Sequence, residues 1–230
     1  MEFFGAGGNV ATLSQRLKQK LNNPDDTRSV SGRARAKRWD RLLLSFPDLA
    51  EMRVLDLGGL PGFWLNASVR PAEVTTVNLV EAESPGPWLR HLVDDACGPT
   101  GLGAETFDLV VSNSLIEHVG GYTARRRLAD VIRSSAPRHW VQTPYRYFPV
   151  EPHWVFPGLQ FLPPHLRAKV IPHWPFGHSN LDYHGALDAA LACELLSLSE
   201  MRLLFPDSFI WHEKVAGLTK SLVAIRQLER

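Results

Sequence analysis

The sequence predicts an α/β protein in which helices cover a mostly parallel sheet. Short runs rich in valine and leucine alternate along the chain with stretches of helical periodicity. One of these runs passes directly into a glycine-rich turn and the start of a helix. Strands that alternate with helices build parallel sheets, because the crossover helices pack on the faces. The 230 residues, 44% of them hydrophobic, suit one globular domain with a sizeable core.

Composition narrows the range of partners and compartments. The formal net charge is +1, so no overall field favours nucleic acid or an anionic membrane as a partner. Two cysteines are too few for a disulfide framework, which indicates a reducing compartment. No apolar run approaches the roughly 20 residues that span a bilayer, and residues 1–5 lack the order of a signal peptide. We therefore expect a cytoplasmic protein with no membrane span.

The stretch that organises the chain is residues 54–62, Val-Leu-Asp-Leu-Gly-Gly-Leu-Pro-Gly. It predicts a buried strand, a turn and the start of a helix, a unit that places a ligand at the carboxyl end of a parallel strand. Gly58, Gly59 and Gly62 let the backbone approach that ligand, and Asp56 offers a fixed acceptor for an amine or hydroxyl. The spacing differs from the G-x-G-x-x-G of dinucleotide-binding folds. The alternative is an ordinary tight turn after a buried strand.

A second informative stretch begins at residue 107. Residues 107–111, Phe-Asp-Leu-Val-Val, predict a buried strand, Ser112 and Asn113 follow at its end, and a helical turn carries Glu117 and His118. The two stretches, in this order, resemble the class I (Rossmann-like) methyltransferases that depend on S-adenosylmethionine (SAM). By motif, the resemblance covers residues 54–143.

The resemblance implies a Rossmann-like seven-stranded sheet flanked by helices, with the last strand antiparallel. It also implies SAM as the cofactor and S-adenosylhomocysteine as the product. The cofactor-binding residues that it implies are Asp56, Leu57, Gly58, Gly59, Gly62, Asn78, Glu81, Asp95, Ala96, Ser112 and Asn113.

Two of these assignments have alternatives. In the family, an acidic residue near the end of the second strand binds the ribose hydroxyls. Asn78 stands there in this sequence and Glu81 follows, so either side chain could make the contact. Asp95 and Ala96 match the turn that holds the adenine, although the same residues could form an Asx turn before Gly98.

Periodicity and turn residues predict the order of the elements. Helices are expected over residues 11–21, 31–45 and 125–134, with a helical stretch over 185–205, and strands over 53–57, 74–80, 91–97, 107–111, 139–143, 208–215 and 219–226. The expected organisation is an N-terminal helical arm or lid (1–50), a SAM-binding core (51–143), a substrate-binding cap (144–184) and a C-terminal helix and strand pair that completes the core (185–230).

The helix over residues 31–45 is rich in arginine. Its basic face predicts either a solvated surface, with Trp39 and the leucines packed inward, or a patch for an anionic substrate or partner.

The cap is the least generic part of the chain. About half of the 17 prolines and more than half of the nine histidines lie between residues 144 and 184, together with many aromatic residues. Proline stiffens loops, and aromatic rings make rigid pocket walls that suit sugar rings or apolar substrates. The alternative is an ordinary packed loop. The substrate-binding candidates are Tyr145, Tyr147, His153 and Trp154.

A hydroxyl acceptor has to lose a proton, so a positioned base or a metal would help methyl transfer. His118 is the first candidate base, since it follows the predicted cofactor turn, and its alternative role is to pack the helix. Glu151 and His153 form the second candidate, in which the carboxylate orients the imidazole. The cap histidines show no metal-ligand spacing. A Mg²⁺ site is left open, with the candidate ligands Asp94, Glu117, Glu151 and Asp182.

We therefore expect a SAM-dependent O-methyltransferase that acts on a small molecule. In its length and in residues 147–153, the chain resembles actinobacterial enzymes that methylate sugars, polysaccharide precursors or natural products. Methyltransferases of methylated mannosides are among these enzymes. The alternatives are a lipid or phenolic acceptor and, from another class, a SAM-binding regulatory or scaffold protein without activity. The sequence leaves a homodimer open.

Overall fold

The computed structural model describes residues 30–174 and 181–228. The first 29 residues of the predicted N-terminal arm, including the predicted helix over residues 11–21, lie outside this part of the chain. None of the helices in the described part combines the length and the apolarity needed to cross a bilayer.

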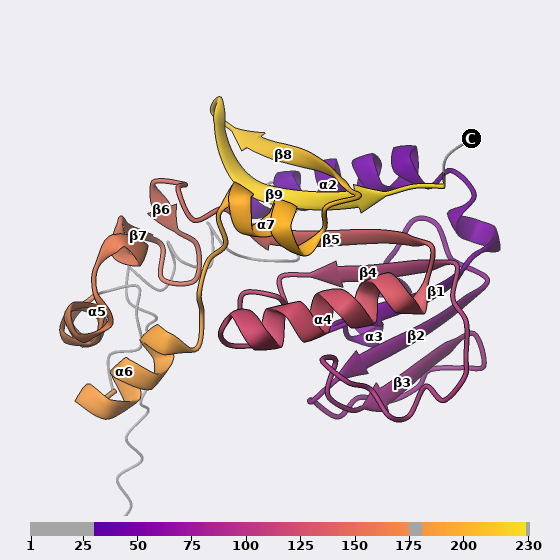
Figure 1. The fold of residues 1–230 in the computed structure, drawn as a ribbon, viewed down its shortest axis with the longest axis horizontal. Coiled ribbons are helices and arrows are strands. Elements are labelled where there is room, and N and C mark those ends of the chain that lie inside the picture. The colour runs from indigo at the N-terminus through magenta and orange to yellow at the C-terminus, as the bar shows by residue number, and fades with distance from the viewer. Residues whose placement is uncertain (1–29, 175–180, 229–230) are drawn as a thin grey trace, which may run out of the picture.

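A seven-stranded sheet forms the centre of the molecule, in the order β3-β2-β1-β4-β5-β9-β8 (Figure 1). The strands are β1 (Arg53–Leu57), β2 (Glu73–Asn78), β3 (Leu89–Val93), β4 (Leu109–Asn113), β5 (Arg138–Pro144), β8 (Phe209–Val215) and β9 (Leu218–Arg226). Strands β1 to β5 are parallel, and β9 pairs antiparallel with both β5 and β8. The fold predicted from the sequence is confirmed, including the antiparallel last strand.

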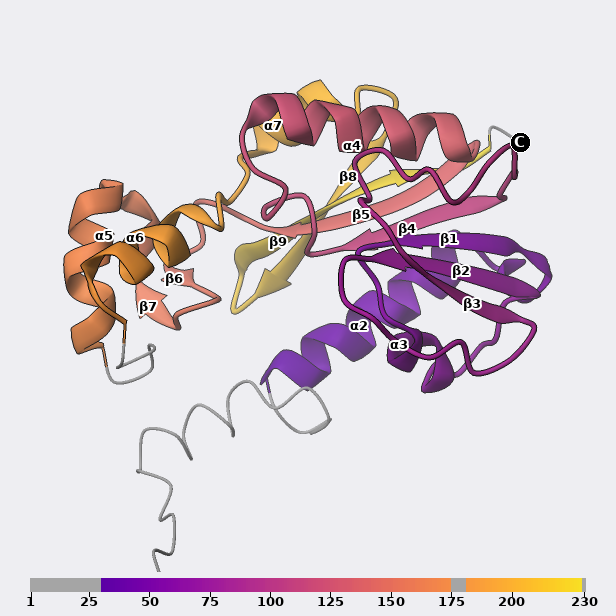
Figure 2. The ribbon, with the colours of Figure 1, turned by 90° about the horizontal axis from the view of Figure 1, so that it is seen from below.

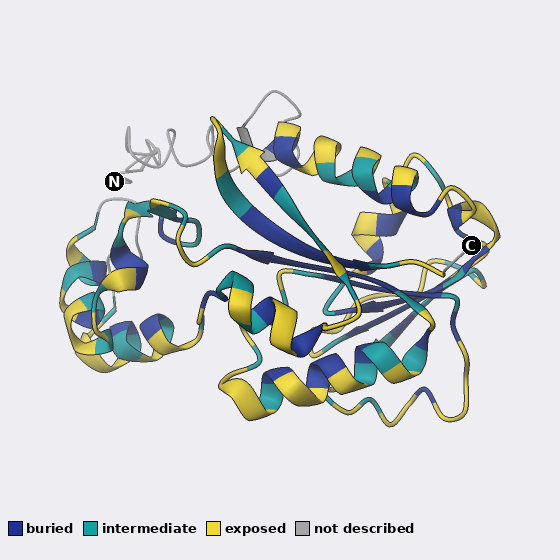
Figure 3. Ribbon diagram, turned by 45° about the horizontal axis from the view of Figure 1, so that its top comes forward, coloured by how far each residue is buried: buried dark blue, intermediate teal, exposed yellow. Residues whose placement is uncertain are grey.

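Helices cover both faces of the sheet (Figure 2). Helices α2 (Val30–Ser45) and α3 (Pro61–Leu65) and the 3-10 turn η1 (Leu49–Glu51) lie on one face, where Leu42, Phe46 and Trp64 are buried against the strands. Helices α4 (Tyr122–Ser135) and α7 (Leu198–Leu204) cover the other face and bury Leu128 and Met201. Figure 3 shows that buried residues follow the central strands and the inner sides of these helices.

Several predicted strands end at other residues in the structure. Strand β4 continues through Ser112 and Asn113, which pair with Val141 and Gln142 of β5. A polar residue fits inside this buried strand because the Ser112 hydroxyl donates to the carbonyl of Leu57 at 3.0 Å. Strand β2 ends at residue 78 and not at 80, and β3 spans residues 89–93 and not 91–97.

The cap has a small core of its own, beside the carboxyl ends of β4 and β5 (Figure 1). It contains β6 (Val150–Glu151), β7 (Phe156–Pro157), η2 (Leu159–Phe161), α5 (Pro164–Val170), η3 (Ile171–His173) and α6 (Tyr183–Leu191). Trp154, Leu159, Ala168 and Ala190 are buried together there.

The helical stretch expected over residues 185–205 is two helices in the structure. Helix α6 packs in the cap core, so the cap extends past the expected boundary at residue 184. An irregular segment follows α6, and helix α7 then starts at a capping box formed by Ser197 and Glu200. Helix α7 packs on the sheet and not in the cap.

A buried arginine holds the segment between the cap and the core. The Arg125 side chain on α4 is 6% exposed and donates to the backbone carbonyl of Glu194 at 2.7 Å and to its carboxylate at 2.9 Å. It also lies 3.4 Å from the carboxylate of Glu200. Helix α4 is thereby tied to both ends of the residue 194–200 segment.

Replacement of Arg125 should destabilise the protein. Arg125→Met leaves Glu194 without its cation and leaves Glu200 with Arg146 alone, at 4.0 Å. We expect the free energy of unfolding to fall by about 2–3 kcal/mol, less than for a fully buried pair because Glu194 is half exposed. Urea unfolding followed by circular dichroism measures the loss. The control is Arg126→Met, whose side chain is 67% exposed and should matter little. Equal midpoints for the two variants would show that the Arg125 pairs add no stability.

Candidate functional site

The glycine turn after β1 is packed tightly against the strand that precedes it. Gly58 has φ +86°, a left-handed conformation that favours glycine. A Cβ atom on Gly59 would lie 1.8 Å from Oδ2 of Asp56, so no side chain fits there. The amide of Asn78, at the end of β2, donates to the carbonyl of Gly58 at 2.6 Å and holds the turn in place. At Gly62, in contrast, an added Cβ would meet nothing within 4 Å.

Asp56 is a buried carboxyl group at the base of this turn. It is 2% exposed, and Nε1 of Trp64 donates to its Oδ2 at 2.8 Å. Burial raises the pKa of Asp56 to about 7, although the hydrogen bond from Trp64 opposes the shift. A cation that binds beside this carboxyl group would favour its ionised form.

A cavity of about 410 Å³ opens beside the glycine turn, between α2 and the carboxyl ends of β1 and β4. It lies where the strand order reverses, because β1 leads to β2 and β3 on one side and to β4 and β5 on the other. Open α/β sheets bind their ligands at such a point. The lining residues are Arg35, Arg38, Trp39, Leu42, Asp56, Gly59, Phe63, Asn113, Ser114 and Trp140.

Helix α2 contributes cations and aromatic surface to this cavity. Arg35 and Arg38 line it, and Arg38 also forms an ion pair at 3.2 Å with Glu213, which is buried in β8. The Trp39 ring lies edge-on to Phe63, with centroids 5.6 Å apart. Arg35 is exposed, and Trp39 and Leu42 pack inward, as the solvated-surface interpretation of the basic helix expects. Arg35 and Arg38 also line the cavity. Sequence reasoning did not assign these residues to the site.

The residues expected at the two ends of the nucleoside lie at or after the carboxyl ends of two different strands, β2 and β3. Asn78 uses its amide to hold the glycine turn, and its Oδ1 accepts from the backbone N–H of Val80. Glu81 follows on an exposed segment. Asp95 is exposed and accepts the backbone N–H of Cys97 at 2.9 Å, which is the Asx turn considered from the sequence. Ala96 beside it is buried.

The candidate bases His118 and His153 lie together, although they come from different segments. Their rings are edge to face, with centroids 5.0 Å apart. Glu151 accepts from Nδ1 of His153 at 2.7 Å, the carboxylate–imidazole contact that the sequence predicted. Burial lowers the pKa of His153, but hydrogen bonds to Cys193 and Glu151 outweigh this and raise it above its ordinary value.

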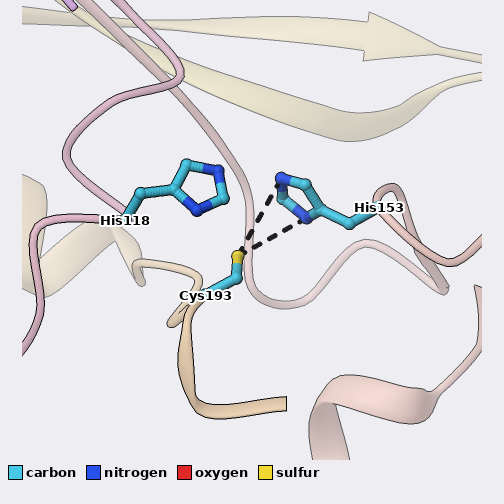
Figure 4. Close-up of side chains that lie close together, drawn as sticks. All are labelled: His118, His153 and Cys193. Atoms are coloured by element: carbon cyan, nitrogen blue, oxygen red, sulfur yellow. Dashed lines mark hydrogen bonds between the residues drawn. The ribbon is translucent and has the colours of Figure 1, made fainter. Parts of the chain in front are cut away.

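Cys193 joins these two histidines from the segment that follows α6 (Figure 4). Its Sγ lies 3.4 Å from Nδ1 and 3.9 Å from Nε2 of His153, and one ligand-type atom of each residue lies within 4.8 Å of the other two. Sequence reasoning missed Cys193, since it lies 40 residues after His153 and no spacing links them.

The aromatic candidates of the cap differ in exposure. Tyr147 is 58% exposed and Phe161 is 54% exposed, and their rings stack with centroids 6.2 Å apart. Tyr145 packs edge-on against Tyr147. Trp154 is 9% exposed and belongs to the cap core, which leaves little of its ring for a ligand.

Comparison with known proteins gives structural similarity only. No protein-family model matches the chain, and no curated protein matches its sequence. The N-methyltransferase NodS from Bradyrhizobium japonicum WM9, solved with S-adenosylhomocysteine, aligns with a TM-score of 0.52 and 15% identity over 94% of this chain and 98% of that one. Magnesium protoporphyrin IX methyltransferase (ChlM) from Synechocystis PCC 6803, with the same ligand, aligns with a TM-score of 0.53 and 13% identity over 93% of each chain.

A third similar structure is the 1,6-didemethyltoxoflavin-N1-methyltransferase of Burkholderia thailandensis, solved with 1,6-didemethyltoxoflavin and S-adenosylhomocysteine. It aligns with a TM-score of 0.51 and 15% identity over 100% of this chain and 93% of that one. The described chain therefore has the fold that these SAM-dependent methyltransferases share.

Proposed function

We propose that this protein is a SAM-dependent methyltransferase that transfers a methyl group to a hydroxyl of a small molecule, with sugars and oligosaccharides as the acceptor class. The observation that carries the proposal is the cavity at the switch point of the sheet, with the glycine turn and Asp56 on its wall. The shared fold of the three methyltransferases above supports the same activity.

The chemistry of the cavity fits the amino-acid end of SAM. Asp56 is a buried acceptor suited to the ammonium group, and Arg35 and Arg38 supply positive charge for the carboxylate. Because Gly59 has no side chain, SAM can approach the backbone of the turn closely. For the nucleoside end we propose Glu81 as the ribose contact, because the amide of Asn78 already holds the turn, and Asp95 with Ala96 as the adenine contact.

When bound, SAM supplies a methyl group activated by its sulfonium. The protein then has to align the acceptor, exclude water and remove the hydroxyl proton. We assign proton removal to His118 or to the neutral form of His153, with Glu151 holding His153 in one orientation. His118 lies four residues after Ser114, which lines the cavity.

The proposal of a sugar acceptor rests on the exposed aromatic pair of the cap. Tyr147 and Phe161 offer a stacked, rigid and solvent-facing surface. Aromatic rings present broad apolar faces at little cost in conformational entropy, which suits the C–H faces of a sugar ring. A screen of hydroxyl acceptors, read out by the formation of S-adenosylhomocysteine, tests the activity. If no acceptor gives this product, a SAM-binding protein without catalysis is favoured.

Gly59→Ala should abolish SAM binding. The added Cβ would overlap with Oδ2 of Asp56 at 1.8 Å, so either the turn or the carboxylate has to move. Calorimetric titration with SAM measures the affinity, and circular dichroism checks the fold. The matched control is Gly121→Ala, where the added Cβ meets nothing within 4 Å. If both variants bind SAM as the wild type does, the cofactor does not occupy this cavity.

Asp56 should make stability and SAM affinity depend on pH. Its pKa is about 7 in the folded protein and about 3.9 in an unfolded chain. Its contribution to stability is therefore complete below about pH 4 and is lost as the pH rises through 7, by up to about 4 kcal/mol. SAM affinity should rise over the same range, because the ionised carboxylate binds the ammonium group.

Asp56→Asn removes this titration and keeps an oxygen that can accept from Trp64. Urea unfolding and SAM titration at pH 5 to 8 measure the effect. Relative to Asp56→Asn, the wild type should lose stability and gain SAM affinity as the pH rises. The control is Asp130→Asn, on the exposed side of α4. Parallel curves for the wild type and Asp56→Asn would rule out titration of Asp56.

The histidine variants test proton removal. His118→Ala and His153→Ala should each lower kcat at least about tenfold and leave SAM affinity nearly unchanged, as expected for groups that act on the acceptor in the transition state. His212→Ala, on β8, is the control. Near-normal kcat in both variants would contradict the assignment of these histidines and the hydroxyl acceptor.

A further inference from the structure

Three side chains of types that can ligate a metal converge beside the cap, from segments that are far apart in the sequence (Figure 4). His118 follows β4, His153 lies between β6 and β7, and Cys193 follows α6. We propose that these three residues form a Zn²⁺ site with an open fourth position.

The hydrogen bonds of the two imidazoles leave the same nitrogen available on each. Nδ1 of His118 lies 3.1 Å from the carbonyl oxygen of Ala192, which can only accept, so Nδ1 carries the proton. Nδ1 of His153 lies 2.7 Å from the carboxylate of Glu151 and donates to it in the same way. In its neutral form each ring therefore keeps the Nε2 lone pair for a ligand. Metal-bound histidines typically donate their other N–H to a carbonyl or a carboxylate in this manner.

The distances are close to those of a tetrahedral zinc site. Zinc binds thiolate sulfur at about 2.3 Å and imidazole nitrogen at about 2.0–2.1 Å, which places these two ligand atoms about 3.5 Å apart. In the structure, Sγ of Cys193 lies 3.9 Å from Nε2 of His153, and it lies 3.4 Å from Nδ1 of the same ring. One ligand atom of His118 completes a set that lies within 4.8 Å. Zinc binding therefore requires Sγ of Cys193 to move from the Nδ1 side of the His153 ring toward Nε2.

Backbone hydrogen bonds hold the ligand segments together. The N–H of Glu194 donates to the carbonyl of Glu117 at 2.8 Å, so the residue before His118 and the residue after Cys193 are paired. Arg125 fixes Glu194 from the other side. Glu151 is held as well, because its second oxygen accepts the backbone N–H of Trp154 at 2.7 Å. Glu151 thus orients His153 and is not itself a ligand.

A buried carboxylate beside the cluster has one oxygen without a hydrogen-bond partner among the described residues. Glu117 is 1% exposed, and its Oε2 accepts from the hydroxyl of Thr143 at 3.0 Å. Within the described part of the chain, its Oε1 has no hydrogen-bond partner. Its charge interacts with both His118 and His153. A bound cation would offset the cost of burying this group.

The ligand set selects zinc over magnesium. Two imidazoles and a thiolate suit Zn²⁺, whereas Mg²⁺ requires oxygen ligands. The Mg²⁺ site left open by the sequence gains no support from this cluster. Three protein ligands also leave a fourth position, as in catalytic zinc sites, and structural sites usually fill all four. His118 is exposed, so water or an acceptor can reach that position.

The role of the ion in catalysis rests on the proposed function, but its binding does not. If the protein methylates a hydroxyl, the open position would hold that oxygen and lower its pKa, as zinc does for bound water. His118 and His153 would then act by holding the ion and not as bases. Zinc binding can be measured without SAM and without an acceptor, so its failure and the failure of methyl transfer are distinct results.

The test is zinc binding to the full chain after chelation. Wild-type protein, stripped and dialysed against Zn²⁺, should retain one ion per chain, and Co²⁺ in its place should give a thiolate-to-metal charge-transfer band. Cys193→Ser and His118→Ala should each weaken Zn²⁺ binding at least about tenfold and remove or shift the band. Glu151→Gln should weaken binding about 10–100-fold by releasing His153. Cys97→Ser, the other cysteine, is the matched control and should bind as the wild type does.

Two results would overturn the proposal. One is a wild-type protein that retains no zinc above the dialysis background. The other is zinc binding by Cys193→Ser and by His118→Ala at wild-type affinity. His118→Ala is included because loss of zinc binding in Cys193→Ser could also come from misfolding. An exposed histidine such as His118 can be replaced with little effect on the core. Circular dichroism of both variants confirms that the fold is kept.

Discussion

The packing of the Asp56 carboxyl group against the backbone of Gly59 is the constraint on which the cavity depends. The carboxyl group occupies the volume that a side chain at residue 59 would need. Trp64 donates to it from α3, and Asn78 secures the other side of the turn from β2. Strand β1, the turn and α3 therefore form one rigid unit at the point where the strand order reverses. The backbone can approach a ligand there because no side chain intervenes.

A second set of contacts decides where the cap meets this unit. The cap has its own core, so its internal packing does not determine its position on the sheet. That position depends on Arg125, which binds Glu194, and on the backbone pairing of Glu194 with Glu117. These contacts bring the segment of Cys193 to His118. The same buried arginine thus connects α4 to the segment that carries Cys193.

Several predicted boundaries failed for a common reason, which is that tertiary contacts replaced local signals. Ser112 and Asn113 looked like the end of a strand because they are polar, but the pairing with β5 and the contact to Leu57 keep them inside it. The stretch over residues 185–205 looked like one helical region. Its first half instead found apolar partners in the cap, and the Ser197 capping box started a new helix.

The sequence by itself determined the fold, the glycine turn with Asp56, and the pairing of Glu151 with His153. These features depend on local patterns: alternation of strands and helices, glycines at a strand end, and two side chains only two residues apart. Only the tertiary structure decided that α2 lines the cavity and that Cys193 meets His118 and His153. His153 and Cys193 are 40 positions apart, and His118 and Ala192, which are joined by a hydrogen bond there, are 74 apart. No local pattern encodes such contacts, because they arise from the way in which separate layers and the cap pack together.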